Sequence, residues 1–183
     1  MAGTYEEAAM TAIIGVDVGV TTGVGWGWYN PALRDRAGIW TALARGRRTG
    51  WAEVRPYKSP AIGHEVCRVV AERIAIWNMG GLDLREILIC IEDFQVRRDL
   101  RGATGQDKLA PVFIAGSLVE TLVMAGYENQ IEFISASTSK SFCSDKRLKE
   151  WGKRTAGRMG WIRGKKHARD ACRLIAVGLE QVV

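Results

Sequence analysis

Two apolar stretches that end in acidic residues constrain the fold of this chain more than any other feature. The first covers residues 12–18 with the sequence AIIGVDV, and Asp17 lies within it. The second covers residues 86–91 and leads directly into Glu92 and Asp93. Apolar runs of this length, rich in β-branched residues, predict strands at the centre of a sheet. Because an unpaired buried carboxylate is costly, Asp17 must be paired, protonated, exposed at its strand end or bound to a metal ion.

Shorter patterns predict three further strands. A turn rich in Gly and Thr follows the first stretch, and residues 23–29 then form a strand that returns antiparallel to it. A third extended segment is expected at residues 38–44, and a short strand at residues 131–135. The full order, β-β-β-α-β-α-β-α, is typical of a mixed α/β fold with one sheet between helices.

Three segments carry apolar side chains at spacings of three and four residues, which predicts amphipathic helices packed on the sheet. They lie between Pro60 and Gly80, over residues 109–125 and over residues 165–182. The expected inner stripes are Ile62, Val66, Val69, Val70, Ile74 and Trp77 in the first helix; Val112, Phe113, Gly116, Val119, Leu122 and Val123 in the second; and Ala168, Ala171, Cys172, Ile175 and Leu179 in the third.

Length and composition exclude several classes of protein. At 183 residues and 47% hydrophobic content, the chain can bury a sizeable core, so intrinsic disorder is not expected. We expect one domain over residues 1–183, with a flexible segment at residues 1–10. No run approaches the roughly 18 apolar residues of a membrane span, and Glu6 and Glu7 stand where a signal peptide would be positive. The expected location is the cytoplasm, with no membrane partner.

The four cysteines are scattered and form no CxxC pair, so we interpret them as buried thiols in a reducing compartment. His64 and His167 show no zinc-ligand spacing with them.

The positive charge is concentrated near the C-terminus. Residues 139–173 hold 12 lysines and arginines against 3 acids, a local charge of +9, whereas the whole chain carries +6 and the remainder therefore carries −3. Such a segment is typical of a surface that meets a polyanion. A solvated helix face is an equally good interpretation of the charge run taken alone.

His167 and Asp170 stand three residues apart in the last predicted helix and therefore share a face. If that face meets Asp17 and Glu92, a cluster of carboxylates results, and such a cluster needs a divalent cation to remain ionised. Oxygen ligands favour Mg²⁺ or Mn²⁺, and two such ions about 4 Å apart can hydrolyse phosphodiesters. For either acid alone a cap or salt bridge is as good an explanation, and His167 could be a surface histidine among lysines.

The ordered motifs IIGVDVGVTTGVGW, ILICIED and HARDACRLIAVGL resemble those of the RuvC family of Holliday-junction resolvases, within the ribonuclease H-like superfamily. The resemblance extends over residues 12–182 and implies a mixed five-stranded sheet flanked by helices. It also implies a homodimer whose subunits each nick one strand of a four-way DNA junction. Val18 stands where many bacterial members have proline, which is typical of a divergent bacterial or bacteriophage member.

Position by position, the resemblance implies a metal site and a catalytic set. Asp17 matches an aspartate that bridges two Mg²⁺ or Mn²⁺ ions, Glu92 the glutamate at the fourth strand's end and Asp170 the last-helix aspartate. His167 matches a position that holds His in some members and Asp in others. Lys165 or Lys166 falls near the scissile phosphate, and we assign Lys166 to the catalytic set.

The remaining basic residues on the expected active-site side are assigned to DNA binding: Arg97, Arg98, Arg101, Lys140, Lys146 and Lys165. Phe94 is the nearest candidate for an aromatic wedge that bacterial members carry after the glutamate. Strand alternation places only one of Glu92 and Asp93 beside Asp17; the resemblance selects Glu92, whereas alternation alone does not decide.

Three other functions fit parts of the pattern. A ribonuclease H acting on RNA–DNA hybrids uses the same metal chemistry. A non-catalytic protein that binds DNA structures would use the carboxylates only to hold its fold. DVGVTTG also resembles the phosphate-binding turn of actin-like ATPases, but those need two such domains, and 183 residues supply one.

Overall fold

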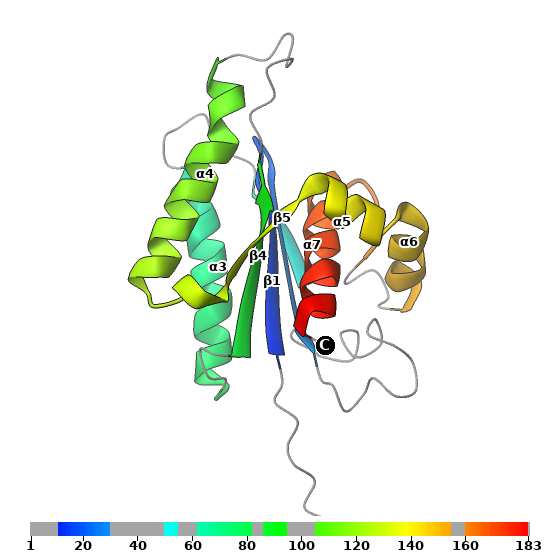
Figure 1. The fold of residues 1–183 in the computed structure, drawn as a ribbon, viewed down its shortest axis with the longest axis horizontal. Helices are drawn as coiled ribbons and strands as arrows, with labels where there is room; N and C mark the ends of the chain where they lie inside the picture. Colours follow the sequence, from blue (N-terminus) through cyan, green and yellow to red (C-terminus); the bar gives the residue numbers. More distant parts are fainter. Residues whose placement is uncertain are drawn as a thin grey trace, which may run out of the picture.

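A five-stranded mixed sheet forms the centre of the computed structural model, which describes residues 11–29, 50–54, 62–81, 86–94, 105–154 and 160–182 (Figure 1). The strands run in the order β3-β2-β1-β4-β5. β1 pairs antiparallel with β2 and parallel with β4; β2–β3 is antiparallel and β4–β5 parallel. The strands are β1 Thr11–Asp17, β2 Thr22–Tyr29, β3 Gly50–Val54, β4 Ile87–Asp93 and β5 Ile131–Ser135.

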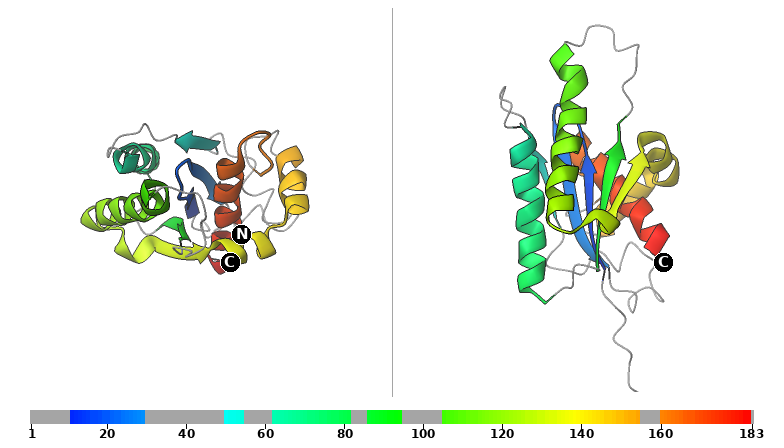
Figure 2. Two further views of the ribbon diagram at one scale, coloured as in Figure 1. Left: turned by 90° about the horizontal axis from the view of Figure 1, so that it is seen from above. Right: turned by 60° about the vertical axis from the view of Figure 1, so that its left-hand side comes forward.

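Helices cover both faces of the sheet (Figures 1 and 2). One face carries α3 (Ile62–Met79) and α4 (Gly105–Met124), and α4 leads through η3 (Glu128–Gln130) into β5. The other face carries α7 (Lys166–Val182), flanked by α5 (Ala136–Phe142) and α6 (Asp145–Arg154). The prediction of a mixed five-stranded sheet flanked by helices is confirmed.

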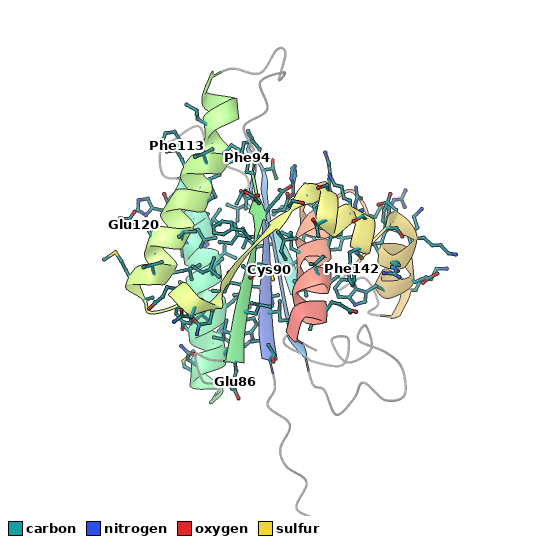
Figure 3. All side chains as sticks on the ribbon, in the orientation of Figure 1. Glu86, Cys90, Phe94, Phe113, Glu120 and Phe142 are labelled. Carbon is teal, nitrogen blue, oxygen red and sulfur yellow. The ribbon has the colours of Figure 1, made fainter. Side chains whose placement is uncertain are left out.

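The two central strands alternate between two separate cores. In β1, Ala12, Ile14 and Val16 pack towards α3 and α4, whereas Ile13 packs towards α7. In β4, Cys90 joins the α7 side, where its side chain is fully buried (Figure 3). The apolar runs therefore read as continuous because both faces of these strands are buried.

The predicted inner stripe of α7 is confirmed, and most of that of α3 is confirmed too. Within α3, Val69 is half-buried and the side chain of Ile62 lies outside the described residues. Val66, Val70, Ile74 and Trp77 of α3 are buried, and so are all five stripe residues of α7. For α4 the prediction is partly wrong: Leu122 is buried as predicted, but Val112, Phe113, Gly116 and Val123 are exposed. Ile114 and Leu118, which were not predicted, are buried as well. Phe113 projects from α4 away from the sheet (Figure 3). Since α4 is apolar on most of its circumference, spacing alone could not choose the inner face.

Other expectations have mixed outcomes. The strand expected at residues 38–44 and the segment at residues 1–10 lie outside the described residues, and β3 occupies residues 50–54. The serine-rich segment after β5 forms α5, capped by the Ser135 hydroxyl, which accepts the Thr138 N–H. All four cysteines are free thiols; Cys90, Cys143 and Cys172 are buried and Cys67 is half-buried. Among the described helices, none is both long and apolar enough to cross a membrane.

Candidate active site

The register of the sheet places Asp17 and Glu92 on the same face. Val16 pairs with Ile91, so the next residues of these parallel strands, Asp17 and Glu92, are neighbours. Asp17 shares its face with Ile13, and Glu92 shares its face with Cys90; both belong to the core under α7. Asp93 follows the parity of Ile91 and points to the opposite face, where it is exposed. The geometry therefore selects Glu92 over Asp93 as the partner of Asp17.

Asp17 and Glu92 share a hydrogen bond in a site that disfavours charge. Asp17 is only 5% exposed, and desolvation raises its pKa to about 6 although the bond to Glu92 lowers it. Desolvation, the bond to Asp17 and the nearby negative charges raise the pKa of Glu92 to about 9. At neutral pH the Glu92 carboxyl therefore keeps its proton and donates it to the Asp17 carboxylate. A bound cation could replace this proton and neutralise the negative charge of both carboxylates.

His167 reaches the same pair from the first turn of α7. Its Nδ1 lies 2.7 Å from Oδ2 of Asp17. Because an ionised carboxylate can only accept, the shared proton belongs on Nδ1. The Nε2 atom is then left for another partner, and a third of the His167 side chain is exposed. The interpretation of His167 as a surface histidine among lysines does not fit this contact.

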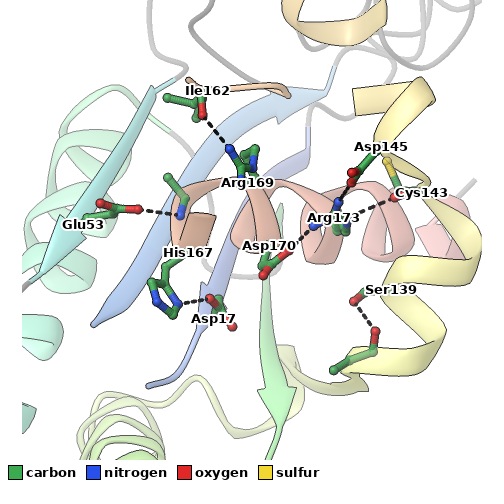
Figure 4. Close-up of polar contacts among 12 residues, drawn as sticks. Asp17, Glu53, Ser139, Cys143, Asp145, Ile162, His167, Arg169, Asp170 and Arg173 are labelled. Carbon is green, nitrogen blue, oxygen red and sulfur yellow. Dashed lines mark hydrogen bonds and ion pairs between the residues drawn. The ribbon is translucent and has the colours of Figure 1, made fainter. Parts of the chain in front are cut away.

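Asp170 lies one turn further along α7 and is held by Arg173 (Figure 4). Its negative charge raises the pKa of both Asp17 and Glu92, so it belongs to the same electrostatic cluster. Arg173 also donates from Nε to the Cys143 carbonyl (3.0 Å) and pairs with Asp145. Arg173 thus links Asp170 to the loop between α5 and α6 and to the first residue of α6.

The four predicted metal ligands have the donor chemistry of a divalent-cation site. Carboxylate oxygens suit Mg²⁺ and Mn²⁺, and the raised pKa values of Asp17 and Glu92 mark negative charge that a cation can neutralise. As they stand, however, no three Asp, Glu, His or Cys side chains within the described residues are arranged to hold a metal ion. Asp170 is instead paired with Arg173, and Asp17 contacts His167 and Glu92. A metal would compete with Arg173 for Asp170 and with a proton for Glu92.

Comparison with solved structures identifies the architecture. RuvC of T. thermophilus in complex with a Holliday junction substrate superposes with a TM-score of 0.60 over 90% of each chain, at 12% sequence identity. The chain has a RuvC-like fold. No family model matches the sequence, and no curated protein matches it significantly. At this identity the similarity concerns the fold alone.

In this RuvC-like fold, two lysines lie close enough to affect the carboxylates. Lys140 on α5 lowers the pKa of both Asp17 and Glu92, and Lys166 at the start of α7 lowers that of Asp17. Both side chains are exposed, as is Lys146 on α6. Arg97, Arg98 and Arg101 lie outside the described residues.

Two aromatic residues and one lysine have packing partners. Trp151 is 1% exposed and belongs to the core under α7. Phe94 packs against the core under α3 and α4, on the face opposite Glu92. Lys165 pairs with Glu53, with 3.3 Å between Nζ and Oε2.

Sequence reasoning missed Glu53 and Arg173. Arg173 stands three residues after Asp170 in an otherwise apolar stripe, and the i, i+3 spacing could have identified the pair. Glu53 is the one acid in the strand GWAEV, and its side chain is only 7% exposed. Its partners lie more than a hundred residues later in the chain, so no local pattern pointed to them.

Proposed function

We propose that this chain is a metal-dependent endonuclease that hydrolyses phosphodiester bonds in branched DNA and resolves four-way junctions. One observation carries the proposal: Asp17 and Glu92 lie side by side on one face of the sheet, beneath the turn of α7 from which His167 contacts Asp17. A RuvC bound to a Holliday junction has this fold, which supports branched DNA as the substrate.

We assign the metal ligands to Asp17, Glu92, Asp170 and His167, with Mg²⁺ or Mn²⁺ as the ion and two ions per site. When bound, the metal supplies an activated water and neutralises charge at the scissile phosphate. Asp17 offers an ionised oxygen near neutral pH, whereas Glu92 must give up its proton to join it. His167 fixes the orientation of Asp17 through Nδ1. Asp170 becomes available when it leaves Arg173.

The lysines divide into two roles in this proposal. Lys166 and Lys140, whose charges already act on the carboxylates, attract the phosphate next to the scissile bond. Lys146, together with Arg97, Arg98 and Arg101, contacts phosphates further along the DNA arms. Lys165 is committed to Glu53 and contributes to DNA binding only where it leaves that pair.

The test is cleavage of a synthetic four-way junction in Mg²⁺ or Mn²⁺. Wild type should nick the junction, and Asp17→Asn and Glu92→Gln should each reduce the rate by about 100-fold or more, because each removes an ionisable oxygen ligand. Asp93→Asn is the matched control, since Asp93 is an exposed acid on the opposite face of the same strand. Wild-type rates in both Asp17→Asn and Glu92→Gln would refute the site.

Substrate comparison separates the alternatives. Preferential cleavage of an RNA–DNA hybrid would identify a ribonuclease H activity instead. Tight junction binding that EDTA does not weaken, with no cleavage in any metal, would identify a DNA-structure binding protein.

We further propose that the nuclease acts as a homodimer. A four-way junction presents two symmetry-related strands, and each chain supplies one set of carboxylates. Two nicks at symmetric positions therefore require two copies.

A further inference from the structure

Glu53 lies in the same cross-strand row as the candidate catalytic carboxylates. Glu53 pairs with Gly23 on β2, and Gly23 pairs with Asp17 on β1. Directly paired residues project to the same face of a sheet, so Glu53 and Asp17 flank Gly23 on the side covered by α7. A buried acid at the edge strand, outside the proposed metal ligands, needs its own explanation.

The first turn of α7 packs directly against the backbone of Gly23. A Cβ atom at residue 23 would lie 2.0 Å from the carbonyl oxygen of His167 and 2.7 Å from the nitrogen of Ala168. The backbone of α7 therefore sits directly over the middle of the row. Because Gly23 has no side chain, the contacts that hold α7 in place across the strands come from its neighbours in the row, Asp17 and Glu53.

Two contacts hold this turn, one from each side (Figure 4). On one side, His167 bonds Asp17 at 2.7 Å. On the other, the Ala168 backbone N–H donates to Oε1 of Glu53 at 3.4 Å, and Oε2 of Glu53 pairs with Lys165 Nζ at 3.3 Å. The Glu53 carboxylate is also stabilised by the helix dipole, because the N-terminus of a helix carries a partial positive charge. Lys165 in turn lies 5.9 Å from the centroid of the Trp51 ring.

We propose that Glu53 is a positioning residue that anchors the first turn of α7 and thereby sets His167 against Asp17. The proposal deepens the nuclease function above and rests on it for its catalytic consequence. Glu53 acts through the backbone N–H of Ala168. The pair with Lys165 keeps the carboxylate in place, and it leaves the exposed Lys166 to face the phosphate.

The first test is NMR of the full chain in EDTA, with the ring ¹⁵N and ¹H signals of its two histidines as probes. Glu53→Ala and Glu53→Asp should shift the His167 signals, because Ala lacks the acceptor and Asp is one methylene too short. Glu53→Gln keeps an acceptor oxygen and should leave them near the wild-type positions. His64 on α3 is exposed and should not move in any variant. Unchanged His167 signals in folded Glu53→Ala, or a shift in Glu53→Gln as large as in Glu53→Ala, would overturn the proposal.

The second test is junction cleavage by the same variants. Glu53→Ala should lower kcat by about 10-fold or more with KM nearly unchanged, since misplacement of a group near the reacting atoms affects the chemical step. Glu53→Gln, which keeps an acceptor for the Ala168 N–H, should restore most of kcat. A rise in KM at constant kcat would instead assign Glu53 and Lys165 to DNA binding and overturn the positioning role.

The two tests separate the two proposals. If wild type cuts no junction, the nuclease proposal fails while the histidine signals still decide whether Glu53 anchors α7. If Glu53→Ala does not fold, Glu53→Asp carries both measurements, because it retains the charge and the partner Lys165.

Discussion

At the scale of single residues, the pair of Asp17 and Glu92 is the most informative part of the molecule, because both carboxyl groups have raised pKa values. The pKa of Glu92 is raised from 4.5 to about 9 and that of Asp17 from 3.8 to about 6, in both cases chiefly by desolvation. The folded protein therefore binds protons at a pH where the unfolded chain has released them. The stability that these protons provide is complete at low pH and is lost as the pH rises through the folded pKa values.

This linkage predicts how the metal-free protein responds to pH. In EDTA, Tm should fall from about pH 5 to about pH 9, and Glu92→Gln should fall less because it has no proton to lose there. Added Mg²⁺ should raise Tm most at the alkaline end, where the carboxylates bind metal without competition from protons. Asp93→Asn serves as the control and should follow wild type. Parallel wild-type and Glu92→Gln curves in thermal melts would contradict this assignment of the pKa values.

At the scale of elements, the site depends on how closely α7 approaches β1 and β2. Glycines make this contact: a Cβ at Gly15 would lie 2.2 Å from the Ala171 carbonyl oxygen, and Gly25 lies under Ile175. In return, Gly178 of α7 leaves room for the thiol of Cys90. The strands and α7 could be predicted from periodicity, but this contact could not, because it joins segments separated by about 150 residues.

A pair of glycine substitutions tests this packing. Gly15→Ala should lower the free energy of unfolding by about 1–3 kcal/mol, because the added methyl group pushes α7 away from the sheet. Gly116→Ala is the control: Gly116 lies on the exposed side of α4 with no atom within 4 Å of an added Cβ. That substitution should instead stabilise the protein by about 0.5–1 kcal/mol. Urea titrations measure both, and an unaffected Gly15→Ala variant would show that α7 is not held this closely.

At the scale of the whole molecule, the positive charge is concentrated in one segment of the chain. Within its described residues, the basic segment at residues 139–173 includes the end of α5, all of α6 and the start of α7. These helices lie on the face of the sheet to which Asp17 and Glu92 project. The sequence motifs predicted the fold class and the four candidate ligands. Asp17 and Glu92 stand at the ends of apolar strands and His167 and Asp170 at the start of the last helix, so local patterns were enough to find them. They did not predict Glu53 or Arg173, whose roles arise only when β3 and α6 pack against α7. The inner face of α4 also had to come from the structure.

The homodimer is testable at this scale. Sedimentation of the free protein should give twice the chain mass of 20.2 kDa, and the complex with a four-way junction should contain two chains per junction. The dimer should place paired nicks at symmetric positions. A monomer in both conditions, with unpaired nicks, would contradict the dimeric mechanism.

The central claim is that Asp17 and Glu92 form a divalent-metal site with Asp170. Crystals grown with Mn²⁺ and measured at the manganese absorption edge test it most directly. We expect an anomalous peak that contacts both Asp17 and Glu92, with Asp170 released from Arg173, and we expect no peak in Asp17→Asn crystals. A wild-type crystal saturated with Mn²⁺ that shows no peak between these carboxylates would contradict the account.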